Sequence, residues 1–214
     1  MDYARIIDYN LLISYARNPA DSLTQAFAGM ILSSARSGFL PPDLPIGLTR
    51  DHFAELLDDY FPGARETLFE EYRDLPGADP LPPFRADEVD DLLALLLEHR
   101  STYERATVWL ACAIAAGCMG QDHLYQDMGL PNRQALSDLL KQNFKPLFEK
   151  NVANMKWKKF FYKQLCDRAE VNMCKAPSCQ VCDDYQKCFG PEDATMPGAP
   201  SAASGQGTTE VGSV

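Results

Sequence analysis

Near its C-terminus the chain reads CKAPSCQVCDDYQKC over residues 174–188. Four cysteines, Cys174, Cys179, Cys182 and Cys188, follow the spacing C-x4-C-x2-C-x5-C. A packed domain has little structural reason to gather four thiols so closely. We therefore expect the rest of the protein to be organised around this segment, as a disulfide knot, a structural zinc site or an iron–sulfur-type cluster.

The cysteine count disfavours disulfides. There are seven cysteines, an odd number, and residues 1–30 lack the cationic start and apolar stretch of a secretory signal. We therefore expect a cytoplasmic protein. In a reducing cytosol, closely spaced cysteines more often bind metal than form bridges.

The spacing also favours a cluster over zinc, although zinc stays open. Structural zinc takes four cysteines as two separated pairs, each on its own knuckle. Here the four form one continuous run with no second knuckle, and the first three reproduce the C-x4-C-x2-C start of plant-type ferredoxins. A single loop suits a cluster of comparable width, because each thiolate can reach a different metal ion.

Residues 154–169, just before this run, are predicted to form a helix. Trp157, Phe160, Phe161 and Leu165 lie at i, i+3, i+4 and i+8 and form one apolar face, which we expect to dock on a helical domain. A basic stripe follows another face, formed by Lys156, Lys159 and Lys163. We expect this helix to aim an irregular cysteine loop and to bring lysines near it.

Charge is distributed unevenly along the chain. The net charge is −10, yet residues 141–190 hold 10 basic and 5 acidic side chains, whereas residues 1–140 hold 10 basic and 22 acidic ones. The cationic segment carries the cysteines, and its charge would attract an oxyanion or offset the charge of a sulfide-rich cluster. The candidate charge-balancing residues are Lys156, Lys159, Lys163 and Lys175. The equally open alternative is that these lysines only solvate a helix face.

Several segments together resemble the NifQ family of nitrogen-fixation proteins. They read MKWKKFFYKQLC over residues 155–166, the four-cysteine run, CFGPE over residues 188–192, and DHLYQDMGL over residues 122–130. The family more usually has Trp in place of Tyr125 and Leu in place of Met128. The resemblance covers residues from about 20 to 192 and is dense only after Cys118.

The resemblance implies an iron–sulfur molybdoprotein that donates molybdenum for assembly of the nitrogenase iron–molybdenum cofactor. Its cofactors would be an iron–sulfur cluster and molybdenum, with molybdate or a molybdenum–sulfur species as cargo and cofactor assembly proteins as partners. We see no nucleophile–base constellation and no phosphate loop, so we expect a carrier rather than an enzyme. The alternatives are a structural zinc-knuckle interaction module and an iron–sulfur electron-transfer protein.

Three residues outside the run are possible accessory ligands: Cys166, His123 and Cys118. Each also has a structural explanation, as a half-buried thiol, a packed ring or a core thiol. Cys112 is expected in the core. His52 and His99 are expected at the surface or in packing.

We expect an all-α protein, because no strand-like alternation with hairpin signals occurs. Helices are predicted over residues 3–17, 22–36, 50–60, 64–72, 87–97, 104–119 and 132–144, with a linker at 74–85. The expected division is a helical scaffold over 1–150, a cluster-binding segment over 151–192 and a disordered tail over 193–214. No apolar run suits a membrane span, and the acidic first 140 residues argue against nucleic acid.

Overall fold

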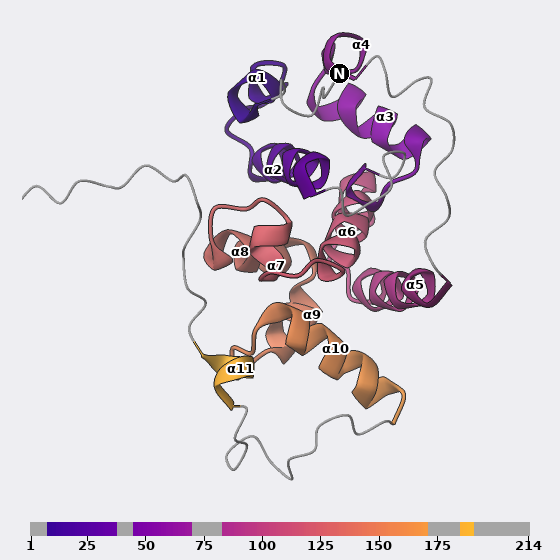
Figure 1. Ribbon diagram of the computed structural model, residues 1–214, viewed down its shortest axis with the longest axis vertical. Coiled ribbons are helices and arrows are strands. Elements are labelled where there is room, and N and C mark those ends of the chain that lie inside the picture. Colours follow the sequence, from indigo (N-terminus) through magenta and orange to yellow (C-terminus); the bar gives the residue numbers. More distant parts are fainter. Residues whose placement is uncertain (1–7, 38–44, 70–82, 171–184, 191–214) are drawn as a thin grey trace, which may run out of the picture.

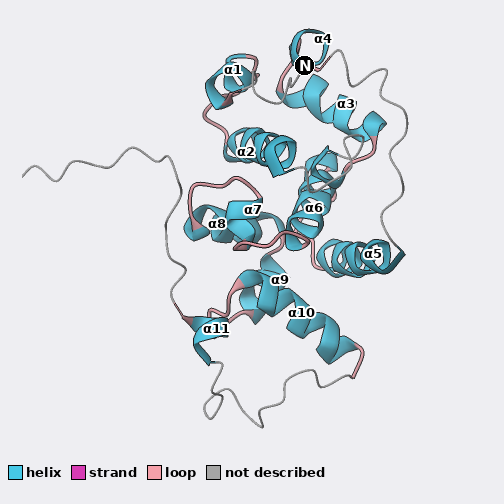
Figure 2. Cartoon of the chain, viewed as in Figure 1, coloured by secondary structure: helices cyan, strands magenta, loops and turns pink. Residues whose placement is uncertain are grey.

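The computed structural model describes residues 8–37, 45–69, 83–170 and 185–190. Within these ranges the regular structure is helical and contains no strand (Figure 2), which confirms the all-α prediction. The helices are α1 (Tyr9–Ser14), α2 (Ser22–Ser37), the 3-10 turn η2 (Pro45–Gly47), α3 (Arg50–Tyr60), α4 (Ala64–Leu68), α5 (Pro83–Glu98), α6 (Arg105–Cys118), α7 (Leu124–Asp127), α8 (Arg133–Asn143), α9 (Lys145–Lys150), α10 (Trp157–Arg168) and α11 (Tyr185–Phe189).

Helix α6 lies at the centre of the molecule (Figure 1). Helices α3, α5 and α7 and the turn η2 pack against it. Nine of its 14 residues are buried, and several are alanines, which let neighbouring helices approach closely. The helix predicted over residues 104–119 is confirmed, and it runs through the core.

Two predicted helix starts are confirmed by their caps. The Asp21 carboxylate accepts a hydrogen bond from the Thr24 N–H (2.8 Å), and α2 begins at Ser22. The Thr49 hydroxyl accepts one from the His52 N–H (3.4 Å), and α3 has the predicted bounds. Short polar side chains satisfy first-turn N–H groups that have no partner within the helix.

Other helix ends differ from the prediction. Helix α1 ends at Ser14 rather than at residue 17, because the Arg17 backbone N–H donates to the Tyr60 carbonyl (3.0 Å) instead of to a carbonyl of the helix. Helix α5 begins at Pro83, inside the expected linker; proline is tolerated in a first turn since no partner for its missing N–H exists there. Helix α10 begins at Trp157 rather than at residue 154 because Asn154 adopts a left-handed conformation (φ 53°).

A close backbone contact joins α2 to the turn after α7. Gly129 has φ +65°, and a Cβ built there would lie 2.3 Å from the Gly29 carbonyl oxygen. A Cβ on Gly29 would in turn lie 2.6 Å from the Gly129 carbonyl oxygen. The two glycines therefore allow a backbone approach that side chains would prevent, and this contact holds the turn after α7 close to α2.

Helix α10 packs against α5. Its residues Trp157, Phe160 and Phe161 belong to the same hydrophobic cluster as α6 and α8. Among the described residues, no helix combines the length and the apolar character needed to cross a bilayer. The tail predicted to be disordered, 193–214, lies outside the described residues.

Candidate metal-cluster site

The structure describes one cysteine of the run, Cys188, which lies on α11. Cys174, Cys179 and Cys182 lie outside the described residues. The Cys188 side chain is half-buried and packs against the hydrophobic core. The prediction of an irregular cysteine loop is wrong for its last part, because residues 185–189 form a short helix.

Helix α11 is held at the start of α10 by two contacts. The Lys156 backbone N–H donates to the Cys188 carbonyl oxygen (2.8 Å). The Lys156 ammonium donates to the Gln186 carbonyl oxygen (3.4 Å). Lys156, the residue before α10, therefore fixes the backbone position of Cys188, although the two are 32 positions apart in sequence.

Side chains brace the turn before α10 in its conformation. The Arg133 guanidinium donates to the Asn154 carbonyl (3.1 Å), to the Asn154 side chain (3.0 Å) and to the Met155 carbonyl (2.8 Å). The Asn151 amide both donates to and accepts from the Met155 backbone (2.8 Å each). These hydrogen bonds hold the backbone of residues 154–155, which precede Lys156 and its contacts with α11.

The aromatic face of α10 anchors it, as the sequence predicted. Trp157, Phe160 and Phe161 are at most 4% exposed. The Trp157 indole N–H donates to the Ser137 hydroxyl on α8 (3.1 Å), and the Trp157 ring stacks on Phe148 of α9 at 5.8 Å. This indole carries one hydrogen-bond donor, so its direct partner on α8 fixes the orientation of the helix start.

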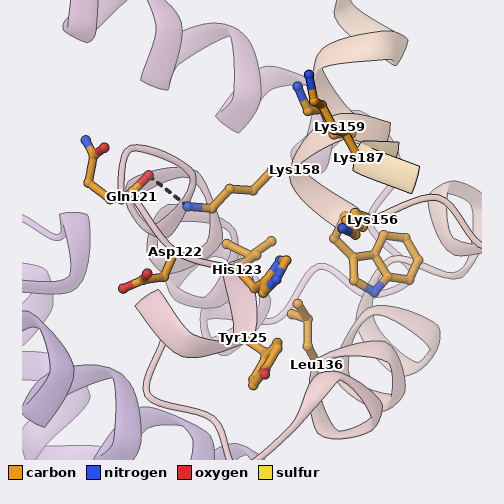
Figure 3. A pocket seen from close by; sticks show the side chains of 12 residues that line it. Gln121, Asp122, His123, Tyr125, Leu136, Lys156, Lys158, Lys159 and Lys187 are labelled. Atoms are coloured by element: carbon orange, nitrogen blue, oxygen red, sulfur yellow. Dashed lines mark hydrogen bonds between the residues drawn. The ribbon is translucent and has the colours of Figure 1, made fainter. Parts of the chain in front are cut away.

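A pocket of about 240 Å³ opens beside this helix start (Figure 3). Four segments line it: residues 120–125 after α6 and in the first turn of α7, Leu136 on α8, residues 156–159 at the start of α10, and Lys187 on α11. His123 contributes its ring, which stacks parallel to Tyr125 (6.2 Å between centroids). The cationic lining residues are Lys156, Lys158, Lys159 and Lys187.

Lys158, which was not among the predicted site residues, forms a partly buried ion pair with Asp127. The two side chains are 17% and 15% exposed, and the Lys158 ammonium also donates to the Gly120 carbonyl (3.0 Å). A Cβ on Gly120 would lie 2.2 Å from the Asp127 carboxyl carbon. Burial raises the pKa of the Asp127 carboxyl, although the hydrogen bond and charge of Lys158 oppose the shift.

The predicted basic stripe divides into different environments. Lys156 is half-buried, and Lys159 is exposed. The Lys163 ammonium is bound by Asp167 one turn on (2.7 Å), so a carboxylate offsets its charge. Lys175 lies outside the described residues. Lys158 and Lys187 line the pocket but were not predicted as site residues. Lys187 is marked in the sequence only by its place before Cys188, and Lys158 lies off the stripe formed by Lys156, Lys159 and Lys163.

The other described cysteines lie on helices α6 and α10. Cys166 is half-buried near the end of α10, ten residues after Lys156, hence about 15 Å along the helix at 1.5 Å per residue. Burial raises the pKa of the Cys118 thiol to about 12 and that of Cys112 to about 11. In the metal-free protein both α6 thiols are therefore mainly protonated at neutral pH, because burial disfavours the thiolate.

The remaining histidines have structural surroundings. His99 is buried, and its ring nitrogens contact the Leu95 carbonyl oxygen (2.8 Å) and the Lys150 ammonium (2.7 Å). His52 is exposed on α3. Both agree with the expected packing or surface roles.

Within the described ranges, no three His, Cys, Asp or Glu side chains are grouped as metal ligands. The candidate donor set remains the four-thiol run predicted from the sequence, of which Cys188 has a described position. Thiolates are soft donors suited to iron–sulfur clusters. Cys188 is accessible in part, and Lys187 and Lys156 beside it would offset negative charge. The chemistry of these residues fits an anionic, sulfur-ligated cluster.

Comparison with known proteins identifies relatives over most of the chain. The NifQ family profile matches residues 26–190. The chain is 39% identical to Protein NifQ of Azotobacter vinelandii over 169 residues, which cover 76% of this chain and 86% of that protein. It is 31% identical to Protein NifQ of Rhodobacter capsulatus over 182 residues, covering 83% and 96%. No solved structure showed significant similarity. The chain therefore belongs to the NifQ family, which is involved in nitrogen fixation.

Proposed function

We propose that this protein carries an iron–sulfur cluster on Cys174, Cys179, Cys182 and Cys188, and that it processes molybdenum and donates it for nitrogenase iron–molybdenum cofactor synthesis. Its partners are cofactor assembly proteins, and its cargo is molybdate or a molybdenum–sulfur species. It works as a carrier without turnover chemistry of its own. Its compartment is the cytoplasm, where thiols stay reduced.

The observation that carries this proposal is the tether between Lys156 and Cys188 (2.8 Å). It supports the idea that α10 positions the cysteine run, because the backbone of the last cysteine is hydrogen-bonded to the residue before that helix. The same tether places the Cys188 backbone next to Lys187 and Lys156, which line a common pocket.

The length of the run allows the other three thiols to reach Cys188. Helix α10 has 12 residues and is about 18 Å long. The 14 residues from 171 to 184 join its end to α11, and a chain of that length can span up to about 46 Å. The thiols at 174, 179 and 182 can therefore converge near Cys188 without displacing α10.

Each part of the chain has a separate task in this proposal. The bound cluster would supply sulfur ligands that retain molybdenum where carboxylates would not. The thiolates of the run hold the cluster, and nearby lysines balance the negative charge of the cluster. The buried aromatic face of α10 keeps the site in place, while exposure of α11 leaves one side open to a partner. Cys166, near the end of α10, would serve as an extra or transient ligand during metal transfer.

The test is elemental analysis of protein purified anaerobically, together with electron paramagnetic resonance. We expect iron, acid-labile sulfide and molybdenum in the wild type. Cys188→Ala and Cys179→Ala are expected to lose most of the iron and the resonance signal. Cys112→Ala is the control, because it removes a half-buried thiol of α6 and is expected to retain the wild-type metal content.

Two results would contradict the proposal. Colourless protein with stoichiometric zinc and no sulfide would instead identify a structural zinc module. Protein whose cluster cycles reversibly between redox states but supplies no molybdenum to cofactor synthesis in vitro would identify an electron carrier.

A further inference from the structure

A buried histidine at the end of α5 contacts an exposed lysine at the end of α9. His99 is 8% exposed, and its Nε2 atom lies 2.7 Å from the Lys150 ammonium nitrogen. The two residues are 51 positions apart in sequence, so only the tertiary structure brings them together. Both side chains can carry positive charge, and their contact therefore restricts the protonation of each.

The hydrogen bonds of the His99 ring fix its tautomer. The Nδ1 atom lies 2.8 Å from the Leu95 carbonyl oxygen, which can only accept, so Nδ1 carries the proton. An ammonium group can only donate, so Nε2 is the unprotonated nitrogen that accepts from Lys150. The neutral imidazole alone satisfies both contacts. His99 therefore presents a proton-accepting nitrogen to the lysine.

Further contacts hold α9 beside the end of α5. The Ser101 backbone N–H donates to the Asn143 carbonyl oxygen (2.7 Å). The Ser101 hydroxyl accepts from the Lys145 backbone N–H (2.9 Å), at the first residue of α9. The contact between the histidine and the lysine therefore rests on two elements that are hydrogen-bonded to each other, and not on a chance meeting of two surface side chains.

The environment of Lys150 differs from that of its neighbour on the same helix. Lys150 is exposed, and in the part of the chain that the structure describes it forms no ion pair with a carboxylate. Lys145 is paired with Glu149 (3.7 Å). A carboxylate partner favours the charged form of a lysine, whereas a neutral imidazole can take its proton. Lys150 thus has a base beside it where Lys145 has a counter-ion.

An amine beside an oriented base is the arrangement of an activated nucleophile. Such sites place the nucleophile and the base within about 2.6–3.2 Å, and a third group orients the base. Lys150, His99 and the Leu95 carbonyl have these three positions. The nucleophile lies at the surface, so a small electrophile in solution can reach it.

We propose that Lys150 is a site of acylation by small acyl phosphates, with His99 as the base. The ammonium loses one proton to solvent through His99, and the amine attacks the acyl carbon. A C–N bond forms, the C–O bond to phosphate breaks, and the second proton from nitrogen leaves with the hydrogen phosphate. Nothing is oxidised or reduced. The product is a neutral amide, which removes one positive charge from the cationic segment 141–190, and the inference does not depend on the metal cluster.

The test is incubation of the full-length protein with acetyl phosphate, followed by peptide mass spectrometry that measures the acetylation rate of each lysine. Lys141 is the internal reference, because it is exposed on α8 and has neither a carboxylate nor a histidine partner within the described ranges. We compare the wild type with His99→Gln, which keeps a polar side chain but lacks a basic nitrogen. Circular dichroism checks the folding of the variant.

We expect Lys150 of the folded wild type to react about tenfold or more faster than Lys141. The two rates should agree within about twofold in His99→Gln and in wild type unfolded by urea, because both changes remove the base. Equal rates in the folded wild type would overturn the site. Faster reaction of Lys150 that persists in folded His99→Gln or in urea would show that His99 is not the base, and would overturn it as well. If His99→Gln does not fold, the comparison of folded and urea-unfolded wild type decides.

Discussion

The backbone N–H of Lys156 donates to the carbonyl oxygen of Cys188 (2.8 Å). This bond joins the residue that precedes α10 to the last cysteine of the run. Lys156 sits on a turn braced by Arg133 and Asn151. The position of the cysteine therefore depends on residues far from it in sequence.

Replacing Lys156 by proline removes this donor with little backbone strain, because Lys156 already has φ −54°. We expect Lys156→Pro to detach α11 from α10, at a cost of about 1 kcal/mol for the lost hydrogen bond. The Cys188 thiol should then react faster with an alkylating reagent in metal-free protein. The measurement is the labelling rate of Cys188 by mass spectrometry.

Lys156→Ala is the control for this change, because it removes the ammonium group but keeps the backbone N–H. We expect its Cys188 labelling rate to rise less than in Lys156→Pro, because only the longer bond to the Gln186 carbonyl (3.4 Å) is lost. Equal acceleration in both variants would mean that the side chain, rather than the backbone bond, holds α11.

The Lys158–Asp127 pair should contribute far more to stability than the Lys163–Asp167 pair on the same helix. The first pair is 17% and 15% exposed, the second 50% and 55%. Removing one partner of this partly buried pair leaves a poorly solvated charge, so we expect Lys158→Met to cost about 2–3 kcal/mol. Lys163→Met should cost about 0.5 kcal/mol or less. Urea denaturation measures both.

The cost of Lys158→Met should also depend on pH. Burial raises the pKa of Asp127 in the folded wild type. The shift contributes stability that is fully present below the ordinary aspartate pKa of 3.8 and is lost as pH rises through the folded pKa. Without Lys158 this pKa should rise further. We expect the cost to grow from acidic to neutral pH and to be mostly recovered in Lys158→Met/Asp127→Asn. A cost independent of pH would contradict the ion pair.

The cysteines should fall into two classes of reactivity. Because burial raises the pKa of Cys112 to about 11 and of Cys118 to about 12, about one thiol in a thousand or fewer is ionised at about pH 8. We expect both to resist alkylation in folded, metal-free protein and to react after denaturation, while the half-buried Cys166 and Cys188 react first. Peptide mass mapping over time is the measurement, and early labelling of Cys118 would contradict its placement in the core.

The contact between Gly29 and Gly129 should tolerate no side chain. We expect Gly129→Ala to cost more than about 3 kcal/mol, because it adds a clash with the Gly29 carbonyl to the strain of a positive φ. Gly63→Ala is the matched control, since Gly63 also has positive φ (+87°) but its Cβ would meet only Tyr15 at 3.7 Å. That variant should cost about 1 kcal/mol. Thermal denaturation compares them, and equal losses would show that strain alone matters.

Local signals in the sequence predicted most helices but misplaced several ends. The caps at Asp21 and Thr49 fix starts because a short side chain bonds an N–H three residues on. No comparable local signal marks the start of α10, which depends on the left-handed Asn154 and on Arg133 from α8. Spacing predicted that Lys159 and Lys163 share a face, but not that Asp167 would bind one of them.

By itself, the sequence determined the helical architecture, the buried aromatic face of α10 and the four-cysteine run, because helix periodicity, capping and thiol spacing are properties of short segments. The tertiary structure alone decided which lysines line a pocket, that Asp127 neutralises Lys158, and that Cys188 is held at the start of α10. These relationships join residues about 30 positions apart, and the packing of α10 against the core and the backbone bond between Lys156 and Cys188 bring them together. No periodicity within one segment can encode such proximity.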